Sequence, residues 1–359
     1  MRWLFPVDRN RIPGNRKNSP SSHQFILVSI LVNERTSMMN PPSRLLIVVA
    51  LVALCLIWGT TWAVIQIGLE SMPPFGGVAL RFGIAAAILL VLARALNIKL
   101  GTTRREKRLW WVNGLLAFCV SYGVVYWSEQ WVPSGLAAIL FATNPLFVAL
   151  LAHLALPSES LNRAEIMGIS LGFVGVGVIF SEDFHALGGE QVRLAALVML
   201  FSPLAAAIAT VTVKRWGAGV HPFSLSAVPM GMTAGIMGAL AVAFENGQDF
   251  NWNMSSIGAL LYLAIFGSVI TFTLYFWLLA HLPAKRLALI AYVIPLVAVV
   301  VGTLRGEPMT LRTLTGAALV VAGTALAVHL HRVSLPPTEA NCRETVKGRV
   351  VERATADID

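Results

Sequence analysis

Arg81 is the only lysine or arginine that lies well inside one of the long apolar stretches of this chain. It follows Pro74 by seven residues, which is ~10 Å along a helix. A charge in an apolar environment is costly and is expected to be paired or to face water or a solute. Three roles stay open: an ion pair with Glu70 or Glu129, an anchor whose head group reaches the membrane interface, and direct contact with a solute. We favour the ion pair over direct contact.

Glu129 is a second charged candidate, although the sequence gives no indication of proton coupling. It lies at the end of the third apolar stretch, and a partly buried carboxyl there could carry a proton. Because the position is near the end of the stretch, a solvated carboxylate or a partner of Arg81 is the favoured interpretation. Glu159 and Glu307 lie in connections, and we interpret them as residues that fix helix starts or loops.

Two prolines, Pro145 and Pro295, lie in the middle of apolar stretches. A proline removes a backbone donor and kinks its helix, so the freed carbonyls need neighbours or a water-filled cavity. Such carbonyls beside Asn144, and near Tyr292 in the second case, would suit a polar solute. A kink that only sets the shape of the helix is the equal alternative.

Further polar and aromatic candidates lie in the first and eighth stretches. Trp58, Thr61 and Gln66 give the first stretch one polar and aromatic face, and Tyr275 lies in the eighth. Aromatic residues in such stretches more often pack or form an interfacial belt than bind ligands. Gln66 is the better candidate, because a buried amide needs a partner.

The composition defines the elements that must position these residues. Hydrophobic residues make up 56% of the chain, charged residues 13%, and the mean hydropathy is +0.72. A soluble domain carries about 25% charged residues, so a lipid bilayer is the expected environment. Ten apolar spans follow, each near the ~20 residues that cross a bilayer: 45–69, 75–96, 109–131, 134–156, 164–181, 192–213, 222–244, 256–280, 287–304 and 313–330.

The placement of lysine and arginine predicts the orientation. With a cytoplasmic N-terminus, thirteen of these residues fall in or beside inner connections, against three in outer connections, Arg193, Arg305 and Arg312. Positive charge is enriched on the cytoplasmic side of membrane proteins, so both termini are expected there. This distribution also accounts for the net charge of +9 without nucleic-acid binding.

The chain repeats part of itself. Trp127, Pro145, Glu159, Gly168 and Gly175 recur in the same order as Trp277, Pro295, Glu307, Gly316 and Gly323. Five spans per copy place the two copies in opposite orientations. The predicted fold is therefore an all-α integral membrane protein with ten transmembrane helices, in two inverted five-helix repeats. This architecture is typical of secondary transporters.

Several segments resemble the EamA-type transporters of the drug/metabolite transporter superfamily. In the first half these are Ile57-Trp-Gly-Thr-Thr-Trp-Ala63, Ile67-Gly-Leu-Glu-Ser-Met-Pro-Pro74, Leu80-Arg-Phe82, Val132-Pro-Ser-Gly-Leu-Ala-Ala138 and Asn144-Pro-Leu-Phe147. In the second half they are Ala291-Tyr-Val-Ile-Pro295 and Gly306-Glu307. One departure is Leu156-Pro-Ser-Glu159, where the family more often has glycine before the glutamate. The resemblance implies a ten-helix bundle in the bacterial inner membrane that exports small metabolites or drugs.

These observations give the following expectations. Residues 1–43 form a basic, disordered arm, 45–181 and 192–331 are the two repeats, and 333–359 is a cytoplasmic tail. The protein is expected to be a transporter of a small molecule by alternating access, monomeric or weakly dimeric, in contact with the lipid bilayer. No cofactor, metal site or enzymatic activity is expected, because no suitable cluster of residues stands out. The alternative is a membrane sensor or assembly partner that keeps this fold without transport.

Overall fold

The computed structural model describes residues 43–98, 100–101, 103–155, 161–181, 189–217, 220–248, 250–281 and 290–329. The chain divides into two units, Met1–Pro42 and Ser43–Asp359, and all described residues belong to the second. The predicted arm as far as residue 42, the tail 333–359 and Glu159 lie outside the described residues.

The described part of the first repeat is helical. Its helices are α2 (Arg44–Leu69), α3 (Pro74–Ala95), α4 (Arg104–Val112), η1 (Asn113–Val120), α5 (Ser121–Ser128), α6 (Ser134–Phe141), α7 (Asn144–Ala155) and α8 (Arg163–Phe180). Side chains cap several of the helix starts: Ser43 accepts from Leu46, and Thr103 and Asn162 form capping boxes with Glu106 and Glu165. Such caps satisfy backbone donors that have no partner inside the helix.

The second repeat is built in the same way. Its helices are α9 (Glu190–Met199), α10 (Phe201–Trp216), α11 (Pro222–Phe244), α12 (Met254–Ala264), η3 (Ile265–Ile270), α13 (Thr271–His281), α15 (Ile290–Leu304) and α16 (Leu311–His329). Pro74 and Pro222 begin α3 and α11, where a missing backbone N–H costs nothing.

Eight helical segments in the described residues are long and apolar enough to cross a membrane. They are Arg44–Leu69, Pro74–Ala95, Arg104–Ser128, Ser134–Ala155, Arg163–Phe180, Glu190–Trp216, Pro222–Phe244 and Met254–Tyr275. Two further apolar helices, Val293–Leu304 and Leu311–Ala327, are shorter.

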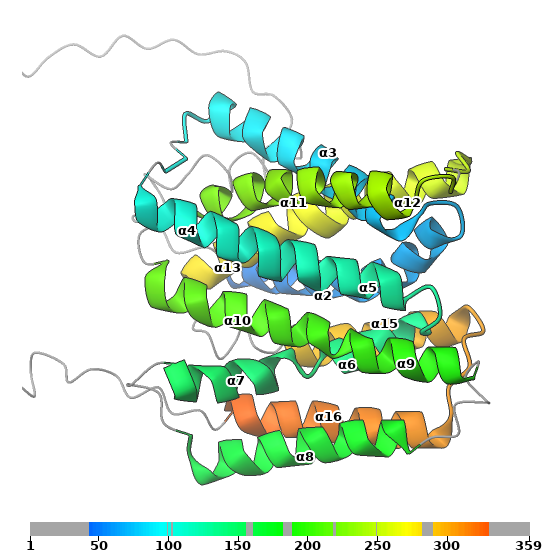
Figure 1. Ribbon diagram of the computed structural model, residues 1–359. Coiled ribbons are helices and arrows are strands. Elements are labelled where there is room, and N and C mark those ends of the chain that lie inside the picture. The colour runs from blue at the N-terminus through cyan, green and yellow to red at the C-terminus, as the bar shows by residue number, and fades with distance from the viewer. Residues whose placement is uncertain are drawn as a thin grey trace, which may run out of the picture. The chain divides into compact units, whose positions relative to one another are not determined.

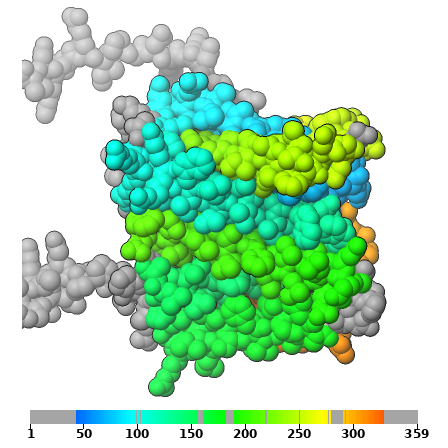
Figure 2. Space-filling model, in the orientation of Figure 1, coloured from blue at the N-terminus to red at the C-terminus, as the bar shows by residue number. Residues whose placement is uncertain are grey.

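Apolar side chains cover much of the exterior of this bundle. Val91, Met167, Phe201 and Val242 are each at least 60% exposed. The face seen in Figure 2 is formed mainly by the span 104–128, α10 and α8, with α11 and α12 above them. An apolar exterior of this extent is suited to hydrocarbon and not to water.

Helices from the two repeats pack against each other. At one edge of the bundle α8 lies beside α16, and at the other α3 lies beside α11 (Figure 1). Between them, α2 packs on α15 and α12, while α10 packs on α7 and η1. Each repeat therefore completes its packing with helices of the other.

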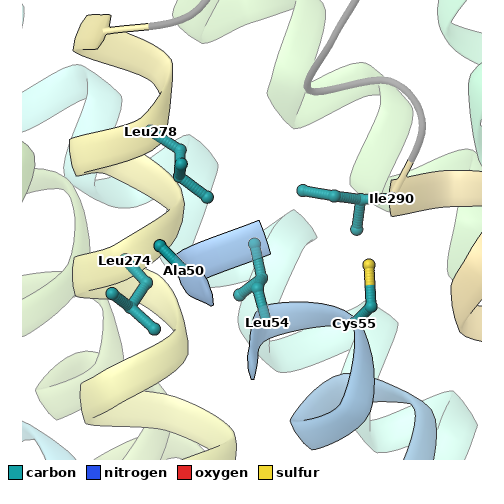
Figure 3. Close-up of a cluster of buried hydrophobic side chains, with 6 residues drawn as sticks. All are labelled: Ala50, Leu54, Cys55, Leu274, Leu278 and Ile290. Atoms are coloured by element: carbon teal, nitrogen blue, oxygen red, sulfur yellow. The ribbon is translucent and has the colours of Figure 1, made fainter. Parts of the chain in front are cut away.

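An apolar cluster joins α2 to α13 and α15 of the second repeat. Figure 3 shows Ala50, Leu54 and Cys55 of α2 together with Leu274 and Leu278 of α13 and Ile290 of α15. All six residues are less than 9% exposed.

Glycines bring α8 and α16 into backbone contact. A Cβ on Gly175 would lie 2.7 Å from the Gly316 carbonyl oxygen, and one on Gly168 would lie 2.6 Å from that of Gly323. These are the repeat-equivalent glycines, paired crosswise. Small residues at helix contacts allow this close approach in membranes.

Gly175→Ala is therefore expected to destabilise the bundle by on the order of 1–3 kcal/mol, the usual cost of overpacking. Gly177→Ala is the matched control, because no atom lies within 4 Å of its added Cβ and alanine favours the helix by up to ~1 kcal/mol. Thermal melting of the two purified variants measures the difference. Equal melting temperatures would contradict the close contact.

The two central prolines have different effects on the backbone. The span 134–155 breaks before Pro145, since α6 ends at Phe141 and α7 begins at Asn144. The Ala142 carbonyl in the break accepts a 3.2 Å hydrogen bond from the Thr324 hydroxyl of α16. By contrast, α15 continues through Pro295.

Two π-helical segments, η1 and η3, interrupt the third and eighth spans. Trp127 and Trp277 are 150 residues apart, and nearly the same offset relates η1 to η3. Segments of this type change the hydrogen-bond register of a helix and occur often at functional sites.

Candidate functional site

Arg81 lies inside the bundle, 1% exposed, on the face of α3 that meets η3 and α5. Its Nε donates to the Ser268 hydroxyl at 3.0 Å, and its Nη2 donates to the Gly267 carbonyl at 3.1 Å. A longer bond of 3.4 Å runs from Nη1 to the Tyr126 hydroxyl. The guanidinium is thus held by helices of both repeats.

Aromatic rings cover the faces of this guanidinium. Its central carbon lies 4.9 Å from the centre of the Tyr122 ring and 5.3 Å from that of Phe82. Cation–π contacts of this kind are worth ~2 kcal/mol or more when they are desolvated. We refer to Arg81, Phe82, Tyr122, Tyr126, Gly267 and Ser268 as the Arg81 site.

The π-helical register of η3 supplies the acceptors of the Arg81 site. The Ser268 hydroxyl donates to the Leu263 carbonyl five residues earlier at 2.9 Å while accepting from Arg81. Gly267 has no side chain between its carbonyl and the guanidinium. A Cβ there would lie 2.9 Å from Thr61 Cγ2 and 3.3 Å from Arg81 Nη2.

Gly267→Ala is expected to displace Arg81 and to lower stability by about 1–3 kcal/mol, as overpacked cores do. Gly258→Ala in the same span is the control, since nothing lies within 4 Å of its added Cβ. Melting temperatures of the two variants provide the measurement. Equal melting temperatures for Gly267→Ala and Gly258→Ala would contradict the close contact at Gly267.

The favoured ion pair of Arg81 is wrong in the described part of the chain. Its hydrogen-bond partners there are all neutral. Glu70 instead lies 3.8 Å from the Arg305 guanidinium, because α2 and α15 end side by side. The interface-anchor alternative is also wrong, since a 1% exposed head group does not reach the surface.

Glu129 is neither solvated nor paired with Arg81, contrary to both favoured interpretations. It caps α5 directly after the span Arg104–Ser128, is 3% exposed, and neither carboxylate oxygen has a hydrogen-bond partner. Burial raises the pKa of this carboxyl well above its usual value; Glu307 adds to the rise, and Arg81 and Arg305 oppose it. The position of Glu129 near the end of its apolar stretch therefore led to an expectation of more solvent contact than the structure shows.

An aromatic series joins the Arg81 site to candidates in the first and eighth spans. Phe82 contacts Phe118, Phe118 contacts Phe272, and Phe272 contacts Trp58, with ring centres 5.3–5.7 Å apart. Tyr275 lies 5.7 Å beyond Trp58. Trp58 and Tyr275 also pack against the apolar cluster shown in Figure 3. Both side chains therefore contribute to the packing of the bundle.

The other candidates have local partners. Thr61 donates to the Trp58 carbonyl of its own helix at 2.6 Å, and its methyl group faces Gly267. Gln66 donates to the Val132 carbonyl at 2.9 Å, just before α6. Its amide therefore has the partner that burial requires.

The proline region contains the remaining candidates. Asn144 donates to the Pro203 carbonyl of α10 at 2.8 Å, beside the helix break at Pro145. Pro295 is buried within α15, and the side chain of Tyr292 lies outside the described residues.

Sequence reasoning missed the residues that complete the Arg81 site. These residues are Gly267, Ser268, Tyr122 and Tyr126, whose types are common in apolar spans. No sequence pattern predicts a π-helical segment. The interpretation of Glu307 as a residue that fixes a helix start is confirmed, because it accepts from the Ser134 hydroxyl and the Gly135 N–H, at 2.5 and 3.1 Å. Glu307 thus fixes the start of α6, a helix of the other repeat.

In the described residues the chain forms a helical bundle with an apolar exterior and the buried guanidinium of Arg81. These features indicate a multi-pass membrane protein. The chain belongs to the EamA-like transporter family, whose model matches residues 45–181 and 193–329. The resemblance seen in the sequence motifs is thereby confirmed, and family membership makes the chain a membrane transporter.

Relatives and a solved structure agree with this assignment. The "Uncharacterized inner membrane transporter YedA" of Escherichia coli (strain K12) is 32% identical over 272 residues, covering 73% of this chain and 83% of that protein. The "Uncharacterized transporter YoaV" of Bacillus subtilis (strain 168) is 26% identical over 283 residues, covering 77% and 94%. A crystal structure with 21% identity has a TM-score of 0.58, covering 81% of this chain and 100% of that one; it bears on the fold alone.

Proposed function

We propose that this chain is a secondary transporter of the bacterial inner membrane that exports small metabolites or drugs by alternating access. The observation that carries the proposal is Arg81, a fully buried guanidinium with neutral partners from both repeats in the described residues. A solute with a carboxylate or another anionic group would supply the missing negative charge. Arginine recognises such groups through paired N–H donors.

The packing of the helices supports two inverted repeats of five spans each. Exchanging the repeats converts the contact of α2 with α15 into that of α10 with α7. It also converts the contacts of α2 with α12 and η3 into those of α10 with α4 and η1. The contacts of α3 with α11 and of α8 with α16 each convert into themselves. These are the relations expected of a pseudo-two-fold axis. With α15 and α16, the eight long spans make ten.

The ends of the helices support the predicted alternation across the membrane. Arg105 donates to the Trp216 carbonyl and Arg215 to the Ala155 carbonyl, which joins ends expected to be cytoplasmic. Arg312 donates to the Ser181 carbonyl, which joins ends expected to be external. The lysine and arginine distribution assigns the sides, and the E. coli relative is named an inner membrane transporter.

A thermal-shift screen tests the proposal. The purified protein is heated with amino acids, purines, sugars and cationic drugs, with Arg81→Ala in parallel. A ligand of the folded state raises the melting temperature by mass action. We expect an anionic or zwitterionic hit that a folded Arg81→Ala protein does not bind. A hit retained by Arg81→Ala would remove Arg81 from the site, and no hit in the whole panel would favour a sensor or assembly partner without transport.

A further inference from the structure

Glu129 is a buried acid that the proposed transport function has not used. Its two carboxylate oxygens are inaccessible and have no hydrogen-bond partner among the described residues, and the hydroxyl of the adjacent Ser128 is in the same situation. An ionised carboxylate without partners is strongly disfavoured in such a place. The arrangement therefore stabilises the neutral acid, with a proton on one oxygen.

The charged groups that act on Glu129 are Glu307, Arg81 and Arg305. Glu307 is bound to the start of α6, and Arg305 contacts Glu70 and donates to the Ala63 carbonyl at 2.8 Å. Of the three, Arg81 is the cation that contacts no carboxylate in the described residues. Its bond to Tyr126 brings it to the last turn of α5, which Glu129 caps.

The other helices packed on α5 leave the charge of Glu129 uncompensated. α9 carries Glu190 and Arg193, which pair with each other at 3.5 Å with side chains 79% and 53% exposed. α10 carries Lys214 and Arg215 in its last turn, while Ser202 near its start contacts Ser121 of α5. η1 contains no ionisable side chain except Cys119. The titratable groups of α5 itself are Tyr122 and Tyr126, which lie against Arg81.

We propose that Glu129 is a proton-binding site linked electrostatically to Arg81, so that an anionic solute and a proton bind together. An ionised Glu129 stabilises the charge of Arg81 and opposes a second anion, whereas a protonated Glu129 leaves Arg81 available. By linkage, an anion that neutralises Arg81 must raise the proton affinity of Glu129 by the same factor. This inference rests on the proposed function, which places the solute at Arg81.

The chemical step is a simple protonation. Hydronium at the membrane surface donates a proton to a Glu129 carboxylate oxygen, one O–H bond forms, and water is left. Release to water reverses the step. Glu129 lies near a helix end, beside the connection to α6, so a small opening there would hydrate it.

Infrared spectroscopy of the full-length protein tests the proposal without a known substrate. The C=O stretch of a protonated carboxylic acid is followed during a pH titration of wild type, Glu129→Gln and Arg81→Gln. Glu70→Gln is the matched control, because the Glu70 side chain is 67% exposed at the same end of the bundle. Benzoate, added to the wild type, serves as an anion that can neutralise Arg81 without mutation.

We expect a protonated-carboxyl band at neutral pH that Glu129→Gln removes and Glu70→Gln retains. We expect its titration midpoint to move to higher pH in Arg81→Gln or, should that variant not fold, in wild type with benzoate. Absence of a Glu129-dependent band at neutral pH would overturn the proton site, and a midpoint moved by neither route would overturn the link. Either failure leaves the proposed transport function untouched, because the ligand screen tests that function. A protein that binds a solute but lacks the Glu129-dependent band would overturn the proton site and not the transport function.

Discussion

Arg81→Lys is expected to weaken solute binding at least ~10-fold, although it keeps the positive charge. The guanidinium donates to Ser268, Gly267 and Tyr126 from three different nitrogens. A lysine ammonium is a compact point charge and does not reproduce that fork. Each buried polar group left without its partner costs about 1–3 kcal/mol, so the melting temperature also falls. Binding is measured by titrating the hit from the ligand screen.

Arg193→Lys provides the control for this prediction. Its side chain is 53% exposed and pairs with Glu190 on the surface of α9, where ion pairs contribute about 0–1 kcal/mol. Stability and binding should therefore stay at the wild-type level. Wild-type affinity in a folded Arg81→Lys protein would show that the guanidinium geometry is not used.

Glu129→Gln is expected to remove a pH dependence of stability. The pKa of Glu129 is raised in the folded protein, so its stabilising contribution is fully present below the ordinary glutamate pKa and is lost as the pH rises through the folded value. The wild-type melting temperature should therefore fall between acidic and mildly alkaline pH. Because an unpaired buried charge costs about 3–5 kcal/mol, the glutamine variant should melt several degrees higher at alkaline pH.

Glu70→Gln separates this effect from surface charge. It removes one carboxylate from the same end of the bundle but leaves Glu129 unchanged, so its melting curve should follow the wild-type pH dependence. A Glu129→Gln protein that loses stability with pH as steeply as the wild type would contradict the assignment of the proton to Glu129.

The helices could be predicted from the sequence because the bilayer imposes a strong signal on each span. Apolar length located the eight long apolar segments, and shorter apolar helices lie at the last two predicted spans. The crosswise glycine pairs, such as Gly175 with Gly316, follow from the repeat. The breaks inside spans were harder to predict. Pro145 interrupts its span and Pro295 does not, since neighbouring helices decide how a proline is accommodated.

The candidate site was predictable only in part. Arg81 and Glu129 were found because charged residues are conspicuous in or beside apolar spans. Their partners were not, because contacts between α3, α5 and η3 depend on packing between repeats. Glu70 seemed as close to Arg81 as any carboxylate along the chain, yet it meets Arg305, more than 200 residues away in sequence.

The most direct test of transport through the Arg81 site is flux in reconstituted liposomes. The solute identified by the ligand screen is loaded in radiolabelled form, and its exchange across the bilayer is followed for wild type and Arg81→Ala. We expect saturable exchange by the wild type and loss of exchange in a folded Arg81→Ala protein. Exchange at the wild-type rate without Arg81, or binding by the wild type with no exchange, would contradict this expectation.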